Sequence, residues 1–245
     1  DITGSDIYRP ETGDFKFQAG PIFHNLILAD EINRAPAKVQ SALLEAMAER
    51  QVTVGGKTYK LPPLFMVMAT QNPIEQEGTY PLPEAQLDRF LMYVKIDQPD
   101  AAAERRILRL VRDEAMTAGQ AGKIEVMPQT GVFAARQEVL NVHLSDALEE
   151  YIVQLVMATR RHEAYDPKFA RWVAFGASPR GTIALDRCAR AGTWLAGRDY
   201  VLPEDIHAVV HDVLRHRIIL TFEAEAEGVT PDSFIDLLLE RVPLP

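Results

Sequence analysis

The sequence predicts an α/β fold in which a parallel sheet covered by helices is followed by a smaller all-helical domain. The first part of the 245-residue chain alternates short apolar runs with helical patterns, which is typical of a parallel sheet. The apolar runs are continuous, as in strands buried on both faces. Beyond about residue 100 the strand signals fade and helical periodicity takes over. We place the boundary near residue 142, which gives domains 1–142 and 143–245.

Three apolar runs are the expected strands of the sheet, at residues 26–29, 65–69 and 91–96. Between the first two, Pro36 is placed to open a helix, because proline fits the start of a helix. Residues 51–61 then alternate around a Gly-Gly pair, which predicts a β-hairpin inserted after that helix.

The second part of the chain carries clear helical stripes. Ser145 is placed to cap one helix, and its apolar positions are Leu148, Ile152, Leu155 and Val156. A second stripe consists of Ile206, Val209, Val210, Val213 and Leu214. Residues 119–131 hold three glycines and Pro128, so we expect them to connect the sheet-bearing part to the helical part.

Composition excludes several classes of protein. The formal net charge of −9 argues against a general nucleic-acid binder, which usually carries an excess of Lys and Arg. No apolar run approaches the ~20 residues that span a bilayer, and the start at Asp1 does not resemble a signal peptide. Cys188 is the only cysteine, which excludes an intrachain disulfide and suits the reducing cytoplasm. We interpret it as a small core residue.

Polar residues follow the first two predicted strands. Asp30 and Glu31 come directly after the first, and Asn72 comes shortly after the second. Because ligands of open α/β sheets bind beyond the carboxyl ends of the strands, Asp30 could hold Mg²⁺ through water and Glu31 could polarise an attacking water. Asn72 could bind water or a phosphate oxygen there. A solvated acidic turn, and a turn residue before Pro73, are the alternatives that the local sequence leaves open.

Two arginines are further candidates. Arg180 follows Ser178 and Pro179, a helix start at which a cation is unfavourable unless an anion such as a phosphate sits there. A solvent-facing arginine is the alternative. Arg89 precedes the third predicted strand, so it could reach into the site of a neighbouring subunit or simply pair with Asp88 or Glu84.

Residues 56–58, Gly-Lys-Thr, look like the end of a phosphate-binding P-loop, but they do not form one. The first glycine of that motif would fall at Gln51, and the prolines at 62 and 63 cannot lie in the helix that a P-loop enters. We therefore expect a hairpin turn there and no nucleotide binding.

Five motifs together resemble the MoxR family of AAA+ ATPases. They are GPIF at 20–23, LADEINRA at 28–35, ATQNP at 69–73, LPEAQLDRF at 82–90 and GASPR at 176–180. Their order and spacing cover nearly the whole chain. The resemblance implies a partial AAA+ nucleotide-binding core with an inserted hairpin, followed by a helical lid.

The resemblance also implies functional roles. Asp30 becomes the Walker B magnesium ligand, Glu31 the catalytic acid, Asn72 the first sensor and Arg180 the second sensor. Arg89 resembles the arginine finger, which makes ATP hydrolysis depend on a homo-oligomer, expected to be a hexameric ring. The implied cofactors are ATP and Mg²⁺.

The family carries its P-loop ahead of the segment that begins at Asp1 in this sequence, so we expect the chain to be truncated at its N-terminus and to bind nucleotide weakly or not at all by itself. The implied function is chaperone-like remodelling of a client protein complex, with a von Willebrand factor A domain protein as a candidate partner. A non-catalytic interaction module is the alternative. A DNA-translocating relative is disfavoured by the acidity of the chain.

Overall fold

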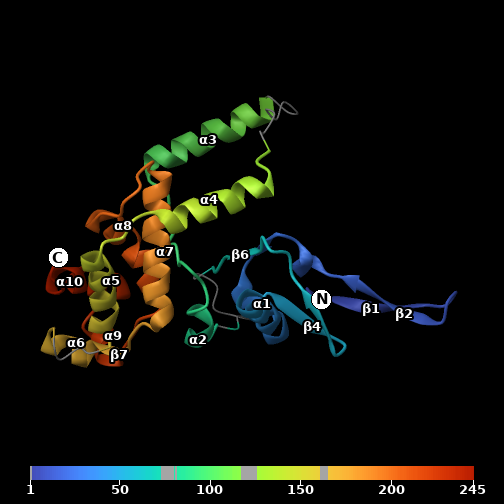
Figure 1. Cartoon of the computed structure of the whole chain (residues 1–245), viewed down its shortest axis with the longest axis horizontal. Coiled ribbons are helices and arrows are strands. Elements are labelled where there is room, and N and C mark those ends of the chain that lie inside the picture. The colour runs from blue at the N-terminus through green and yellow to red at the C-terminus, as the bar shows by residue number, and fades with distance from the viewer. Residues whose placement is uncertain (1, 73–79, 81, 117–125, 161–164) are drawn as a thin grey trace.

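The computed structural model describes residues 2–72, 80, 82–116, 126–160 and 165–245. Figure 1 shows an elongated molecule with the strands of the N-terminal part at one end and the C-terminal helices at the other. The buried apolar side chains fall into two clusters, one within residues 22–82 and one within residues 142–242. The division of the chain at residue 142 stays a prediction.

The parallel sheet contains strands β3 (Leu26–Ala29) and β6 (Met66–Ala69), which end in register at Ala29 and Ala69. Within the part of the chain that the structure describes, these two strands pair only with each other. The prediction that they are buried on both faces is wrong. Ile27 is buried, but Leu28 is 65% exposed and Met68 57%, because the described residues cover only one face of the pair.

The third predicted strand, residues 91–96, does not form in the structure. Its backbone instead bonds to the helical part: the Tyr93 N–H donates to the carbonyl of Asp212 at 2.7 Å, and Arg215 donates to the carbonyl of Tyr93 at 2.6 Å. Met92 packs against the helical core. Contacts with the helices therefore satisfy polar groups that a neighbouring strand would otherwise satisfy.

The helix and hairpin between β3 and β6 are confirmed. Helix α1 (Ala37–Glu49) follows Pro36, and strands β4 (Gln51–Val54) and β5 (Lys57–Lys60) form an antiparallel hairpin. Gly55 and Gly56 have φ angles of 57° and 78°, as a tight hairpin turn requires, so the Gly-Lys-Thr sequence lies in a hairpin and not in a P-loop.

A second hairpin was not predicted from the sequence. Strands β1 (Gly4–Arg9) and β2 (Asp14–Ala19) are antiparallel and project from the body of the molecule (Figure 1). The ring of Phe17 in β2 stacks on that of Tyr59 in β5, with centroids 4.3 Å apart, and this contact joins the two hairpins. The described residues of the N-terminal part also form the short helices η1 (Pro21–Phe23), η2 (Ile32–Arg34) and α2 (Glu84–Leu87).

The C-terminal part is helical, as predicted. Its helices are α3 (Ala101–Met116), α4 (Gln129–Asn141), α5 (Asp146–Ala158), α6 (Pro167–Trp172), α7 (Pro179–Leu195), α8 (Pro203–Leu214), α9 (Phe222–Ala226) and α10 (Pro231–Arg241). A short antiparallel pair, β7 (Val173–Phe175) and β8 (Ile219–Leu220), was not predicted. Ser145 caps α5 by accepting a hydrogen bond from the Leu148 N–H. Cys188 is buried, which raises the pKa of its thiol to about 11 and fits a core residue.

The predicted connection at residues 119–131 is partly wrong. Its first part, to residue 125, lies outside the described residues, but α4 begins at Gln129 and includes Gly131. A glycine destabilises a helix by only about 1 kcal/mol relative to alanine, so the helix continues through it. None of the helices in the described ranges is long and apolar enough to cross a membrane.

Candidate functional site

The two predicted catalytic acids lie at the carboxyl edge of the parallel strand pair. Asp30 and Glu31 follow β3 directly, and Thr70 follows β6 at the same level. The Thr70 hydroxyl donates a hydrogen bond to Asp30 Oδ1 at 2.6 Å and accepts one from the Glu31 N–H at 2.8 Å. The ends of the two strands are therefore joined by one side chain that contacts both acidic residues.

Glu31 adopts an unusual backbone conformation. Its φ and ψ angles of 49° and 53° are left-handed, a region that costs a non-glycine residue on the order of 1–2 kcal/mol. Its carboxylate forms an ion pair with Arg34, N to O 2.9 Å, and its side chain is 33% exposed. The turn thus presents a carboxylate that solvent can reach, at the edge of the sheet where ligands bind.

Asn72 follows the end of β6 by three residues. Its side chain is partly buried. The loop that follows it, residues 73–79, lies outside the described residues. The structure therefore brings together Asp30, Glu31 and Thr70, while the sensor role of Asn72 stays a prediction.

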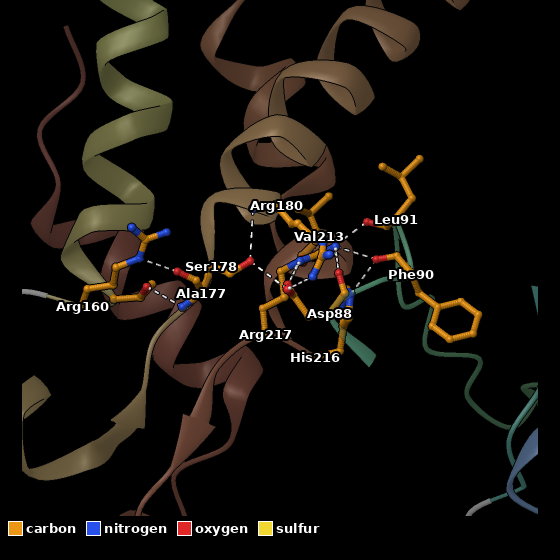
Figure 2. A network of polar contacts seen from close by, with 11 residues as sticks. Asp88, Phe90, Leu91, Arg160, Ala177, Ser178, Arg180, Val213, His216 and Arg217 are labelled. Carbon is orange, nitrogen blue, oxygen red and sulfur yellow. Dashed lines mark hydrogen bonds and ion pairs between the residues drawn. The ribbon is translucent and has the colours of Figure 1, made fainter. Parts of the chain in front are cut away.

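The predicted second sensor, Arg180, belongs to a network that joins the two parts of the molecule (Figure 2). The carboxylate of Asp88 accepts hydrogen bonds from Ser178 at 2.8 Å, from Arg180 at 3.2 Å and from Arg217 at 3.0 Å. Burial by itself raises the pKa of Asp88, but the hydrogen bonds from Ser178 and Arg180 and the charge of Arg217 hold the pKa below its usual value. The anion expected at the start of α7 is thus the Asp88 carboxylate.

Arg217 is the most enclosed member of this network, with a side chain that is only 2% exposed. It also donates to the carbonyl oxygens of Phe90, Leu91 and Val213. Burial lowers the pKa of its guanidinium, and the charge of Asp88 opposes that shift. Arg217 therefore fastens residues 88–91 to the end of α8.

His216 lies beside this network. Burial lowers its pKa to about 4, and the charge of Arg217 adds to the shift. The imidazole is neutral at pH 7, and its Nε2 lies 3.2 Å from the carbonyl oxygen of Phe90. Because a carbonyl only accepts, we assign the proton to Nε2.

A cavity of about 440 Å³ opens between α1, β6 and α7. The charged residues that line it are Arg50, Asp88, Arg89, Arg180, Arg187 and Arg217. Five guanidinium groups face one carboxylate, so the cavity favours an anion. The two predicted arginines, Arg89 and Arg180, both line it, whereas Asp30 and Glu31 do not.

Arg89 does not form the local ion pair that the sequence left open. Its Nη1 donates to the carbonyl of Leu44 in α1 at 3.1 Å, and Asp88 is engaged by Arg180 and Arg217. The side chain of Arg89 remains exposed. This position is compatible with a role at a subunit surface, which stays a prediction.

Sequence reasoning missed Thr70 and Arg217. The sequence did contain a signal for Thr70, because this residue directly follows one strand as Asp30 directly follows the neighbouring strand. Arg217 is separated from Asp88 by 129 residues, so no local pattern could have paired them.

A parallel strand pair with two acids at its carboxyl edge, followed by a helical part that carries an arginine at a helix start, has the arrangement of an AAA+ ATPase, and two family profiles show this class. The family profile described as "ATPase family associated with various cellular activities (AAA)" matches residues 1–92, and that of the "AAA lid domain" matches residues 169–237. The two profiles match the two parts of the chain in the same order.

The relatives identify the family. The chain is 47% identical over 247 residues to "Chaperone MoxR1" of Mycobacterium tuberculosis, covering 100% of this chain and 64% of that protein. It is 34% identical to "Protein MoxR" of Paracoccus denitrificans, covering 96% and 73%. A crystal structure of a "putative ATPase" from Cytophaga hutchinsonii aligns with a TM-score of 0.89 at 46% identity, covering 100% and 74%. The chain belongs to the MoxR family of AAA+ ATPases, and it spans about two thirds to three quarters of the length of these relatives.

Proposed function

We propose that this chain is part of an enzyme that hydrolyses ATP with Mg²⁺, in which Asp30 and Glu31 provide the acidic groups. The observation that carries the proposal is the pair of acids after β3, held to the end of β6 by Thr70. In this role Asp30 would hold the metal and Glu31 would orient and polarise the attacking water. Asn72, three residues after β6, would align that water by a hydrogen bond.

The residues present fit a magnesium ion bound mainly through water. Carboxylate and hydroxyl oxygens are the hard ligands that Mg²⁺ prefers, and Mg²⁺ usually keeps several waters and binds one or two carboxylates plus substrate phosphates. Among the described residues no cluster of three or more His, Cys, Asp or Glu could hold a metal by itself. When bound with the nucleotide, the ion would neutralise charge on the phosphates, and Asp30 would hold it, mainly through water.

The lid would contribute Arg180. Its side chain is 54% exposed, and its Nη1 donates to Asp88 Oδ2 at 3.2 Å, a carboxylate that also pairs with Arg217. A nucleotide phosphate that reached the cationic cavity would compete with Asp88 for Arg180. Movement of α7 would then follow the state of the nucleotide.

We also propose that the complete protein assembles into a homo-oligomeric, hexameric ring in which Arg89 serves the neighbouring active site. The chaperone name of the relative from M. tuberculosis supports a client protein complex as the substrate of remodelling. A von Willebrand factor A domain protein remains our candidate partner, and we propose no nucleic-acid substrate. The lone, buried Cys188 fits our expectation of a cytoplasmic protein.

The test is magnesium-dependent ATP turnover by the full-length protein, with Glu31→Gln as the variant. The substitution preserves shape and removes the carboxylate, so we expect turnover to fall by about 10²–10⁴-fold, the usual contribution of a positioned base. Glu49→Gln, at the end of α1, is a matched control at an exposed glutamate and should retain wild-type turnover. Wild-type protein that neither binds nor hydrolyses ATP would favour a non-catalytic interaction module.

A further inference from the structure

We propose that the hydroxyl group of Thr70 is a positioning group that fixes Asp30 and Glu31 in one arrangement. The inference rests on the proposed ATPase function and concerns the same site. Thr70 does not need to touch nucleotide in this role, because it acts through the two acids. The observation behind it is that one hydroxyl contacts both residues across the strand pair.

The direction of each hydrogen bond follows from the chemistry of the groups. A backbone N–H can only donate, so the Thr70 oxygen accepts from Glu31 at 2.8 Å. The single hydroxyl proton is then available for Asp30, whose Oδ1 lies at 2.6 Å. This contact selects one orientation of the Asp30 carboxylate and does not use its second oxygen, Oδ2.

The same residue supports the left-handed turn at Glu31. The Ile32 N–H donates to the Thr70 carbonyl at 2.9 Å, and the Thr70 N–H donates to the Ala29 carbonyl at 3.1 Å. Thr70 therefore contacts residues on both sides of Glu31 as well as Glu31 itself. Because the φ angle of 49° is unfavourable for a glutamate, these hydrogen bonds maintain a conformation that the residue alone would leave.

The backbone hydrogen bonds of Thr70 do not depend on its side chain, so a substitution can remove the hydroxyl while these bonds remain. Thr70→Val replaces the hydroxyl with a methyl group of similar size and retains both backbone hydrogen bonds. Thr70→Ala removes the hydroxyl together with the methyl group, and Thr70→Ser retains the hydroxyl without the methyl group. Thr53→Val makes the same chemical change in β4, where the hydroxyl donates to Glu45 at 3.3 Å, away from the site.

The first measurement is amide hydrogen exchange in the nucleotide-free, full-length protein. Loss of the bond to the hydroxyl should speed exchange at the Glu31 amide about tenfold in Thr70→Val and Thr70→Ala, the change expected for one hydrogen bond. Thr70→Ser and Thr53→Val should exchange there at the wild-type rate. Unchanged exchange in both hydroxyl-free variants would overturn the proposal, whatever the enzyme activity.

The second measurement is ATP turnover by the same proteins. We expect kcat to fall about 10–100-fold in Thr70→Val and Thr70→Ala with little change in KM. Displaced catalytic groups slow the chemical step more than they weaken substrate binding. Thr70→Ser keeps the hydroxyl and should retain most of the wild-type kcat. A serine variant as slow as the valine variant, or a valine variant as fast as wild type, would overturn the positioning role.

The two readouts separate failure of this inference from failure of the proposed function. If wild-type protein does not hydrolyse ATP, the proposed function fails, and hydrogen exchange still decides whether the hydroxyl fixes Glu31. If wild-type protein is active and Glu31→Gln is not, the proposed function stands and the Thr70 variants decide the inference alone.

Discussion

At the scale of single residues, Ser178 caps α7 by accepting a hydrogen bond from the Arg180 N–H two residues on. Because this contact joins near neighbours in the chain, the cap could be predicted from the sequence. The position of Asp30 and Glu31 at the edge of the sheet could be predicted because they follow an apolar run directly, whereas their catalytic role stays a prediction. Thr70 is visible in the sequence as a polar residue directly after an apolar run, but its contact with both acids depends on the register of β3 against β6, which the sequence does not state.

His216 gives a pH dependence of stability that the sequence does not show. Its pKa is about 4 in the folded protein, compared with 6.5 for an unperturbed histidine, which is the value expected in the unfolded chain. Between these values the unfolded state binds a proton that the folded state does not, so the free energy of unfolding falls as the pH is lowered from 6.5 towards 4. The loss should reach about 3 kcal/mol across that window and should not grow further, through this group, below about pH 4.

Urea denaturation at about pH 6.5 and about pH 4.5 measures this effect. His216→Gln keeps an N–H near the Phe90 carbonyl but cannot be protonated, so the stability difference between the two pH values should shrink by about 2–3 kcal/mol. His24→Gln, at a histidine with a more accessible side chain, controls for loss of a histidine as such. An equal pH dependence in wild type and His216→Gln would show that His216 is not the titrating group.

At the scale of elements, the secondary structure of a segment depends on the neighbours that it contacts. Residues 91–96 have the composition of a strand, yet their backbone bonds to α8 through Tyr93 and Arg215, and they form no strand. In contrast, the β4–β5 hairpin and helix α1 were predicted correctly, because glycine turns and helical stripes specify structure locally. Strand pairing is non-local, so an apolar run alone cannot determine it.

The contact between the sheet-bearing part and the lid depends on Asp88. Asp88→Asn keeps the shape of the side chain but removes the charge that compensates the buried guanidinium of Arg217. We expect the free energy of unfolding to fall by about 3 kcal/mol, the cost of breaking a buried ion pair by removing one partner. Chemical denaturation of the full-length protein provides the measurement.

Asp186→Asn is the matched control for this prediction. Its carboxylate pairs with Arg190 along α7, is 36% exposed, and should contribute only about 0–1 kcal/mol. Comparable losses in Asp88→Asn and Asp186→Asn would mean that the Asp88 network is no stronger than a surface ion pair.

At the scale of the whole molecule, the order of the two parts was predictable but their connection was not. Periodicity separated a sheet-bearing part from a helical part, and two core clusters are present. The cationic cavity, however, gathers Arg50 and Arg89 from the first part and Arg180, Arg187 and Arg217 from the second. Such a convergence depends on tertiary packing, and each arginine taken alone resembles an ordinary surface residue.

The ring proposal predicts that two defective chains can repair each other. If Glu31 acts in the site of its own subunit and Arg89 acts in the neighbouring site, then Arg89→Ala and Glu31→Gln should each abolish turnover in homogeneous rings. In rings assembled from equal amounts of both, about one interface in four combines an intact Glu31 with an intact Arg89 from the neighbour, so turnover should recover to about a quarter of wild type.

The measurement is ATP turnover after co-assembly of the two variants, and each variant alone gives the baseline. The control is a double variant, Arg89→Ala with Glu31→Gln, mixed with Glu31→Gln protein. This mixture contains no intact Glu31, so its turnover cannot recover. Recovery requires that the two residues come from different chains, because no single chain in the mixture holds both. If Arg89→Ala alone is fully active, Arg89 is not the arginine finger, and its hydrogen bond to the Leu44 carbonyl is a structural contact. If both variants are inactive and their mixture stays inactive, Glu31 and Arg89 are needed in the same subunit, and the arginine finger must be sought among the other arginines that line the cavity.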